Sequence, residues 1–172
     1  MKQQLDPKAV WMFAISSFFT WLFVILILGV QGAFIFEEIG LLQLGFAFWA
    51  PIILIVPFVV AWAYGVLSYK FYFYELTDDG FRKESGIIWK RYTTIPYERI
   101  QNVDIHRGII ARILGLSDLQ VQTAGSSAMY NGSWGMSGAG AEGRLPGLSR
   151  ETAEKLRDEL VRRSKTARTS GL

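Results

Sequence analysis

The sequence predicts an α+β protein. An N-terminal hairpin of two transmembrane helices precedes a curved antiparallel sheet or small barrel, which is capped by a C-terminal helix. Three observations predict this fold. Two long stretches near the N-terminus carry no charge, β-prone runs separated by turn residues begin near Ser68, and one amphipathic helical pattern closes the chain. With 172 residues, the chain has room for about one domain.

The transmembrane hairpin is predicted from residues 10–30 and 39–69, neither of which contains Asp, Glu, Lys or Arg. A helix needs about 20 mostly apolar residues to cross a bilayer, and both stretches are long enough. The first stretch also exceeds the apolar core of a signal peptide. We therefore predict a transmembrane hairpin over residues 1–69, with helices over about 10–30 and 41–67. Because neither span holds an ionisable residue, an ion or proton pathway is not expected.

The charges that flank the spans predict their orientation. The connector, residues 31–40, carries only Glu37 and Glu38, whereas Lys2 and Lys8 precede the first span and sixteen basic residues follow the second. Lysine and arginine concentrate on the cytoplasmic side of membrane proteins. The sequence therefore predicts a multi-pass protein of the cell membrane with both termini in the cytoplasm.

The first strands of the domain follow the second span. The aromatic run from Tyr69 to Tyr74 suits the membrane interface and then a strand. Turn residues at Thr77–Gly80 and at Ser85–Gly86 separate this run from two further β-prone runs, the second extending from Trp89 to Ile95. These residues predict three successive strands.

The stretch YERIQNVDIHRG, residues 97–108, gathers charged groups and the only histidine of the chain. Val103 and Ile105 alternate with polar residues, which is the period of a half-buried strand, and His106 is expected on its solvent face. A lone histidine without other ligand residues at metal-binding spacing does not predict a metal site. Arg99 is expected to make a structural bridge to a carboxylate or carbonyl. We interpret the stretch as a strand and not as a catalytic cluster.

A short helix and the clearest strand come next. Two pairs lie at i,i+4 spacing, Ile109 with Ile113 and Ile110 with Leu114, which predicts one or two helical turns over residues 109–116 that plug the core. Leu119, Val121 and Thr123 then alternate with glutamines, as in a strand with one buried face.

The last elements are a glycine-rich connection and a helix. Residues 125–147 contain seven glycines and predict a hairpin connection with a weakly marked returning strand near 139–145, and they do not match a phosphate-binding loop. A helix capped by Ser149 is predicted to extend to about Arg163. The tail, residues 166–172, is expected to be disordered.

The order of three motifs resembles a known family. The motifs are Ile95-Pro96-Tyr97-Glu98-Arg99-Ile100-Gln101, Arg112-Ile113-Leu114-Gly115-Leu116 and Thr123-Ala124-Gly125. With two membrane helices before them, they make residues 10–165 similar to the bacterial pleckstrin-homology-like (PH-like) membrane proteins of the YdbS-like type. This resemblance implies that residues 70–165 form a PH-like domain, a bent antiparallel barrel of roughly seven strands capped by the final helix. The glycine-rich segment is longer than the family's usual hairpin.

The sequence favours a non-enzymatic interaction module that is anchored in the lipid bilayer and binds a protein partner or copies of itself. With no cysteine, one histidine and no paired carboxylates in a motif, it offers no recognisable nucleophile and base. No catalytic residue, cofactor site or metal site is predicted. Basic and acidic residues are interleaved along residues 68–172, so nucleic-acid binding is not predicted either.

The alternative is a module that binds anionic lipid headgroups. Four basic residues at neighbouring strands can converge across a hairpin, namely Arg82, Lys83, Lys90 and Arg91. Each basic group near an anionic membrane contributes about 1 kcal/mol to the free energy of membrane binding. Acidic residues beside the four weaken their field, so a solvated strand face is the competing interpretation.

Three large side chains in the glycine-rich segment are further candidates for a contact with lipid or a partner: Tyr130, Trp134 and Met136. A segment made otherwise of small residues cannot bury them by regular packing, and exposed aromatic groups often mark an interface. The loops at one rim of PH-like folds are the usual contact surface, so the resemblance points the same way. The competing interpretation is that Trp134 folds back onto the domain.

Overall fold

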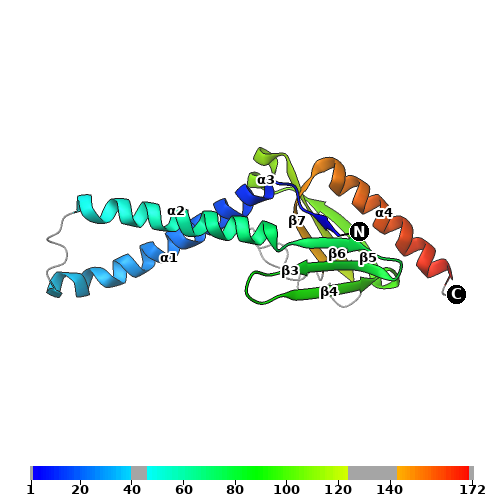
Figure 1. Ribbon diagram of the computed structural model, residues 1–172, viewed down its shortest axis with the longest axis horizontal. Coiled ribbons are helices and arrows are strands. Elements are labelled where there is room, and N and C mark those ends of the chain that lie inside the picture. Colours follow the sequence, from blue (N-terminus) through cyan, green and yellow to red (C-terminus); the bar gives the residue numbers. More distant parts are fainter. Residues whose placement is uncertain (1, 40–45, 124–142, 171–172) are drawn as a thin grey trace. The chain divides into compact units, whose positions relative to one another are not determined.

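A computed structural model describes residues 2–39, 46–123 and 143–170 (Figure 1). The chain forms two compact units, a helical unit of Val10–Leu67 and a sheet unit that combines Met1–Ala9 with Ser68–Leu172. The residues before α1 therefore belong to the sheet unit, whereas the sequence groups them with the transmembrane hairpin of residues 1–69.

The helical unit consists of α1 (Ala9–Ile39) and α2 (Phe46–Lys70). Each contains a window long and apolar enough to cross a membrane, Ala9–Ile27 and Ile53–Lys70, and only 17% of each window is buried. Helix α1 continues through Glu37 and Glu38, whereas the sequence predicts a helix that ends near residue 30. Charged residues limit how far a helix can enter lipid, but they do not break its backbone hydrogen bonds.

Small residues let α1 and α2 approach closely. An added Cβ at Gly65 of α2 would lie 2.7 Å from the Val10 carbonyl oxygen and 3.0 Å from the Ala14 Cβ of α1. Trp11 and Trp62 pack edge to face beside this contact, with ring centroids 4.7 Å apart. Close backbone approach through Gly and Ala is typical of helix pairs in membranes.

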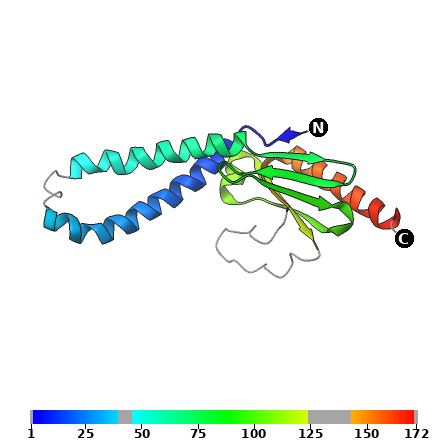
Figure 2. The ribbon, with the colours of Figure 1, turned by 60° about the horizontal axis from the view of Figure 1, so that its bottom comes forward.

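The sheet unit contains two antiparallel sheets and helix α4. The strand orders are β1-β2-β3-β4 and β5-β6-β7. The strands are β1 (Gln3–Gln4), β2 (Phe73–Leu76), β3 (Gly80–Ser85), β4 (Arg91–Pro96), β5 (Ile100–His106), β6 (Leu116–Thr123) and β7 (Gly143–Ser149). Figure 2 shows the strands from a second side.

The described strands do not close into the single barrel that the resemblance implies. After β4, Pro96 leads into the 3-10 turn η2 (Tyr97–Arg99), and β5 then begins the second sheet. The expectation that Tyr97–Arg99 belong to a strand is therefore wrong. Proline cannot donate a ladder hydrogen bond, so the chain changes sheets at this position. His106 lies exposed at the end of β5, as predicted.

Strand β1 was not predicted, because two residues are too few to show a period. It pairs with β2 through Gln3 with Tyr74 and Gln4 with Phe73. Farther along, the Asp6 amide donates to the Gly147 carbonyl oxygen of β7 at 3.2 Å, and the Leu5 side chain is buried. The segment before α1 is thus integrated into both sheets.

Two further predictions differ from the structure. Helix α3 (Ile109–Leu114) buries Ala111 and half-buries Ile110 and Leu114, but it leaves Ile109 and Ile113 exposed, so only one of the two predicted pairs faces inward. Strand β4 begins at Arg91 instead of Trp89, because Gly86 has φ = +111° and starts a longer turn. An added Cβ at Gly86 would lie 2.0 Å from the Trp89 carbonyl oxygen, so this turn requires glycine.

Helix α4 (Arg150–Ser170) caps the structure by packing on β5, β6, β7 and η2. Ser149 caps it as predicted, since its Oγ accepts a hydrogen bond from the Thr152 amide at 3.2 Å. Ala153, Leu156 and Leu160 form the buried stripe. The helix continues to Ser170, so the prediction of a disordered tail from residue 166 is wrong over the described part, where Arg168 donates to the Ile100 carbonyl oxygen.

The two sheets meet closely at Gly143. An added Cβ there would lie 2.8 Å from Ile95 Cδ1 and 2.9 Å from Val121 Cβ, side chains of different sheets. We expect Gly143→Ala to destabilise the sheet unit by about 1–2 kcal/mol through overpacking. Hydrogen exchange at the amides of β6 in the detergent-solubilised chain measures this loss.

Gly108→Ala is the matched control, because an added Cβ there has no neighbour within 4 Å and φ is −67°. Its effect should stay within about 0.5 kcal/mol. Equal protection of β6 in the two variants would contradict the close packing at Gly143.

Candidate functional site

The basic residues predicted to form a headgroup site divide between the two faces of the first sheet. Phe81 of β3 pairs with Ile95 of β4 and both are buried, so they mark the inner face. Side chains alternate along a strand, which places Lys83 on the inner face and Arg82 on the outer face. Arg91 is in register two pairs beyond Lys83 and also belongs to the inner face.

On the outer face, the charges are balanced. Arg82 lies opposite Glu75 in the register of β2 and β3. Lys2 donates to Glu84 at 2.9 Å, and this hydrogen bond lowers the pKa of the Glu84 carboxyl. For Arg82, the solvated strand face is therefore the better interpretation. Lys90 lies in the turn between β3 and β4.

On the inner face, a basic cluster forms from Lys83, Arg91 and Arg144 of β7. Desolvation lowers the pKa of the Lys83 ammonium to about 8, and the positive charges of Arg91 and Arg144 act in the same direction. Burial of a charge beside like charges is costly, and ligand-binding sites often retain such strain.

Arg144 is fixed in this cluster by hydrogen bonds at both ends. Its guanidinium donates to the Asp118 carboxylate at 2.6 Å, and the other Asp118 oxygen accepts the Gly147 amide at 3.1 Å. The Tyr72 hydroxyl donates to the Arg144 carbonyl oxygen. Burial raises the pKa of Tyr72, so this hydroxyl stays protonated. The backbone and the side chain of Arg144 are thus both held in place beside Lys83.

A polar groove lies at the end of the sheet unit that is formed by the β2–β3 turn and η2. Strand β2 leads to this end from the last residues of α2, so we refer to it as the far end. The groove is open, has a volume of about 700 Å³, and lies between this turn, η2 and the last turns of α4. We call it the far groove. Its lining residues are Asp78, Asp79, Pro96, Tyr97, Glu98, Arg162, Arg163, Thr166 and Ala167.

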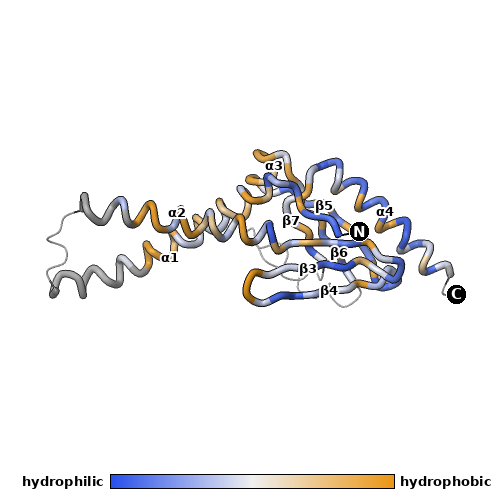
Figure 3. Tube along the Cα trace, in the orientation of Figure 1, coloured by the Kyte–Doolittle hydropathy of each residue, from blue (hydrophilic) through white to orange (hydrophobic). Residues whose placement is uncertain are grey.

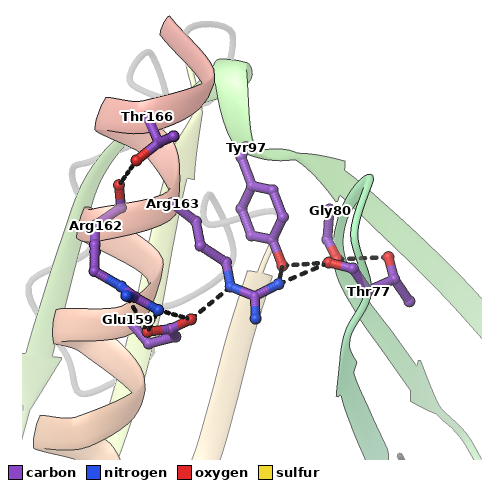
Figure 4. Close-up of polar contacts among 7 residues, drawn as sticks. All are labelled: Thr77, Gly80, Tyr97, Glu159, Arg162, Arg163 and Thr166. Atoms are coloured by element: carbon purple, nitrogen blue, oxygen red, sulfur yellow. Dashed lines mark hydrogen bonds and ion pairs between the residues drawn. The ribbon is translucent and has the colours of Figure 1, made fainter. Parts of the chain in front are cut away.

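A hydrogen-bond network centred on Arg163 holds the walls of the far groove together (Figure 4). Arg163 Nη1 donates to the Thr77 carbonyl oxygen at 3.0 Å and to the Tyr97 hydroxyl at 3.1 Å. The Tyr97 hydroxyl donates to the same Thr77 oxygen at 2.7 Å. One side chain of α4 therefore joins the turn between β2 and β3 to η2.

Glu159 orients the two arginines of the groove. Arg162 lies 2.7 Å and Arg163 2.6 Å from its carboxylate. The hydrogen bonds from Arg162 and Arg163 lower the pKa of Glu159 to about 2. The i,i+4 spacing of Glu159 and Arg163 is visible in the sequence, but the connection of this pair to Tyr97 and Thr77 is not. The sequence predicts a structural bridge from Arg99 instead, a residue that is exposed on η2.

Opposite the arginines, the acidic wall of the groove consists of Asp78, Asp79 and Glu98, all three exposed or half-buried. Three carboxylates thus face two guanidiniums that Glu159 already pairs. The sequence contained the signal for this site, because a turn of two aspartates and a helix end rich in arginine are both visible in it. What it lacked was the register that brings them together.

One group of predicted contact residues lies in a part of the chain that the structure does not describe. Tyr130, Trp134 and Met136 lie outside the described residues. Over residues 2–39, 46–123 and 143–170, no group of His, Cys, Asp or Glu is arranged to hold a metal ion.

Comparisons with known proteins agree with this architecture. A family model for the bacterial PH domain matches residues 17–164. The chain is 28% identical over 125 residues to the UPF0699 transmembrane protein YdbT of Bacillus subtilis (strain 168). That alignment covers 73% of this chain but only 23% of the relative, so the chain spans about a quarter of that protein's length. No solved structure matches the chain.

The family match extends from the first membrane helix into α4 and thus includes both units. The relative is a transmembrane protein, and α1 and α2 each carry an apolar window long enough to span a bilayer. The protein is therefore membrane-associated and carries a PH-like domain. The chain belongs to the bacterial PH domain family.

Proposed function

We propose that this chain is a non-enzymatic, membrane-anchored interaction module that binds a protein segment in the far groove. The observation that carries the proposal is the groove itself, whose walls are fixed by Arg163, Tyr97 and Thr77 while its acidic side chains remain accessible. A preformed, charged groove suits recognition because few of its side chains must be ordered on binding.

The charge of the groove indicates the chemistry of its partner. Glu159 already pairs with Arg162 and Arg163, whereas Asp78, Asp79 and Glu98 contribute three carboxylates to the lining. A segment rich in lysine and arginine complements this wall through charge-assisted hydrogen bonds. Such a segment comes either from another protein or from a second copy of this chain.

The orientation predicted from the sequence is part of the proposal. Residues Met1–Ala9 belong to the sheet unit together with Ser68–Leu172, which supports placing both ends of the helix hairpin on one side of the membrane. Lysines before α1 and the basic residues after α2 favour the cytoplasm for that side. The far groove would then be open to cytoplasmic proteins.

Site-specific photo-crosslinking in cells tests the groove. A photoreactive amino acid replaces Glu98, which lines the groove, or Glu151, an exposed glutamate at the opposite end of α4. We expect Glu98 to give a defined protein adduct that Glu151 does not give. Mass spectrometry of the adduct distinguishes a different protein from a second copy. Identical adduct patterns at the two positions would contradict a groove-specific partner.

A second candidate function, binding of anionic lipid headgroups, is supported by the basic cluster. Lys83, Arg91 and Arg144 converge on the inner face, and the lowered pKa of Lys83 reflects their mutual repulsion in addition to burial. Tyr72, whose hydroxyl donates to the Arg144 carbonyl oxygen, follows closely after the end of α2 at Lys70. A phosphate group would relieve the repulsion, so a soluble headgroup fragment should stabilise the folded chain.

A further inference from the structure

Two parts of the sheet unit expose large apolar side chains. In the β3–β4 turn, Ile88 is 84% and Trp89 87% exposed, and in α3, Ile109 is 73% and Ile113 79% exposed. Figure 3 shows both segments as hydrophobic beside polar strands. Exposure of such large apolar side chains to water is unfavourable, so a surface that covers them would stabilise the protein.

The register places the β3–β4 turn beside the end of α2. Phe73, which follows the end of α2 at Lys70, pairs with Glu84 near the end of β3. The turn that carries Ile88 and Trp89 continues beyond Glu84 in the direction from which α2 arrives. Ser68–Lys70 belong to the sheet unit, so this placement is internal to that unit.

Helix α3 lies at the corresponding end of the second sheet, beside the start of α1. Leu116, the first residue after α3 and Gly115, pairs with Ser149 at the end of β7. Close to that end, the Gly147 carbonyl oxygen accepts the Asp6 amide, and the Asp6 carbonyl oxygen accepts the amide of Ala9, the first residue of α1. Figures 1 and 2 both show α3 and the β3–β4 turn at one end of the sheet unit.

The charges around both apolar segments are basic. Residues 86–92 contain Lys90 and Arg91, residues 107–115 contain Arg107 and Arg112, and neither stretch contains Asp or Glu. Anionic lipids attract such groups at the membrane surface, while isoleucine and tryptophan insert into the boundary between headgroups and acyl chains. Apolar tips with basic flanks therefore fit a lipid surface better than a neutral protein surface.

We propose that the β3–β4 turn and α3 insert into the interfacial region of the bilayer in which α1 and α2 are anchored. Together with the starts and ends of these helices, the two insertions fix the sheet unit on the membrane and direct the far groove away from it. This contact needs no specific ligand. It is independent of the groove, and it shares only Arg91 with the basic cluster on the inner face.

Because the chain contains no cysteine, single cysteines can be introduced and labelled in the full-length protein. Ile88→Cys and Ile109→Cys report on the two segments and leave Trp89 and Ile113 in place. Asp79→Cys, in the turn at the other end of β3, is the matched control. Each variant receives the same small fluorophore and is reconstituted into vesicles of phosphatidylcholine and phosphatidylglycerol.

We expect spin-labelled lipids to quench the fluorophore at positions 88 and 109 but not at 79, and aqueous iodide to quench it at 79 only. Adding Trp89→Glu to the Ile88→Cys variant should remove most of the lipid quenching, because a carboxylate is expelled from the interface. Iodide quenching at 88 and 109 equal to that at 79 would overturn the proposal. Protection from iodide without lipid quenching would overturn it as well, since it would reveal a contact between chains.

Discussion

Arg163→Ala is expected to destabilise the far end of the sheet unit by about 2–3 kcal/mol. The guanidinium donates to Glu159, to Tyr97 and to the Thr77 carbonyl oxygen, so it joins three elements at once. It also lies over the Tyr97 ring, 5.5 Å from the centroid. Removing it leaves the Thr77 oxygen with Tyr97 as its remaining side-chain donor, and it leaves Glu159 paired with Arg162 alone.

Hydrogen exchange at the amides of β2 and β3 measures this loss, because these strands are joined by the turn that Arg163 holds. Arg157→Ala is the matched control, since Arg157 lies on the same helix and pairs with its neighbour Asp158 at 2.8 Å. An exposed pair of this kind contributes about 0–1 kcal/mol. If the two variants changed the hydrogen-exchange rates of β2 and β3 equally, the Arg163 network would not stabilise the contact between these elements.

Much of the fold follows from local patterns in the sequence. The two uncharged stretches predicted α1 and α2, and alternation predicted the strands that contain Val103 and Val121. Ser149 predicted the start of α4, because its capping bond needs only residues one turn away. Each of these signals is contained within a few residues, which is why the sequence alone could show them.

The remaining features depend on residues far apart in the chain. Strand β1 is recognised only by its partner β2, on the other side of both membrane helices. Strand β7 brings Arg144 near Lys83, but the start of this strand lies in a glycine-rich segment where the sequence pattern is weak. Ile109 with Ile113 and Ile110 with Leu114 have the same spacing, and the sequence does not show which pair faces inward; the structure exposes the first pair and half-buries the second.

The split between Arg82 and Lys83 could have been predicted. Adjacent residues of a strand point to opposite faces, so these two could not belong to one site. The inference required only the buried positions of Phe81 and Ile95, which the sequence suggests as the apolar members of their strands. Pleat alternation, applied before charge clustering, identifies Lys83 and Arg91 as the pair on one face.

Lys83→Met should stabilise the sheet unit by about 2 kcal/mol at pH 7. The folded pKa of Lys83 is lowered to about 8 from 10.5. Each pKa unit corresponds to about 1.4 kcal/mol of free energy. The energy for the whole shift is reduced here because the Lys83 side chain is only partly buried and solvent screens its charge. Between these two pKa values the unfolded chain binds more protons, so the stability of the native protein rises with pH across this window. Below about pH 8 Lys83 is charged in both states, and the destabilisation from its buried charge is fully present.

In Lys83→Met, the rise in stability between about pH 8 and 10.5 should disappear, and hydrogen exchange at β6 can measure it as a difference from the native chain. Arg82→Met is the matched control, because it removes an adjacent charge from the outer face. A rise in stability that persists in Lys83→Met would show that Lys83 does not produce it.

The same variant decides whether the basic cluster binds headgroups. A ligand that binds only the folded state stabilises it by mass action. Glycerol phosphate, a soluble headgroup fragment, should raise the melting temperature of the detergent-solubilised native chain and of Arg82→Met, but not of Lys83→Met. Such a result would mean that Lys83 lowers stability in the free protein in order to bind an anion, as functional sites commonly do. If glycerol phosphate raised the melting temperatures of all three proteins equally, its effect would be a general salt effect. The cluster would then not be a headgroup site.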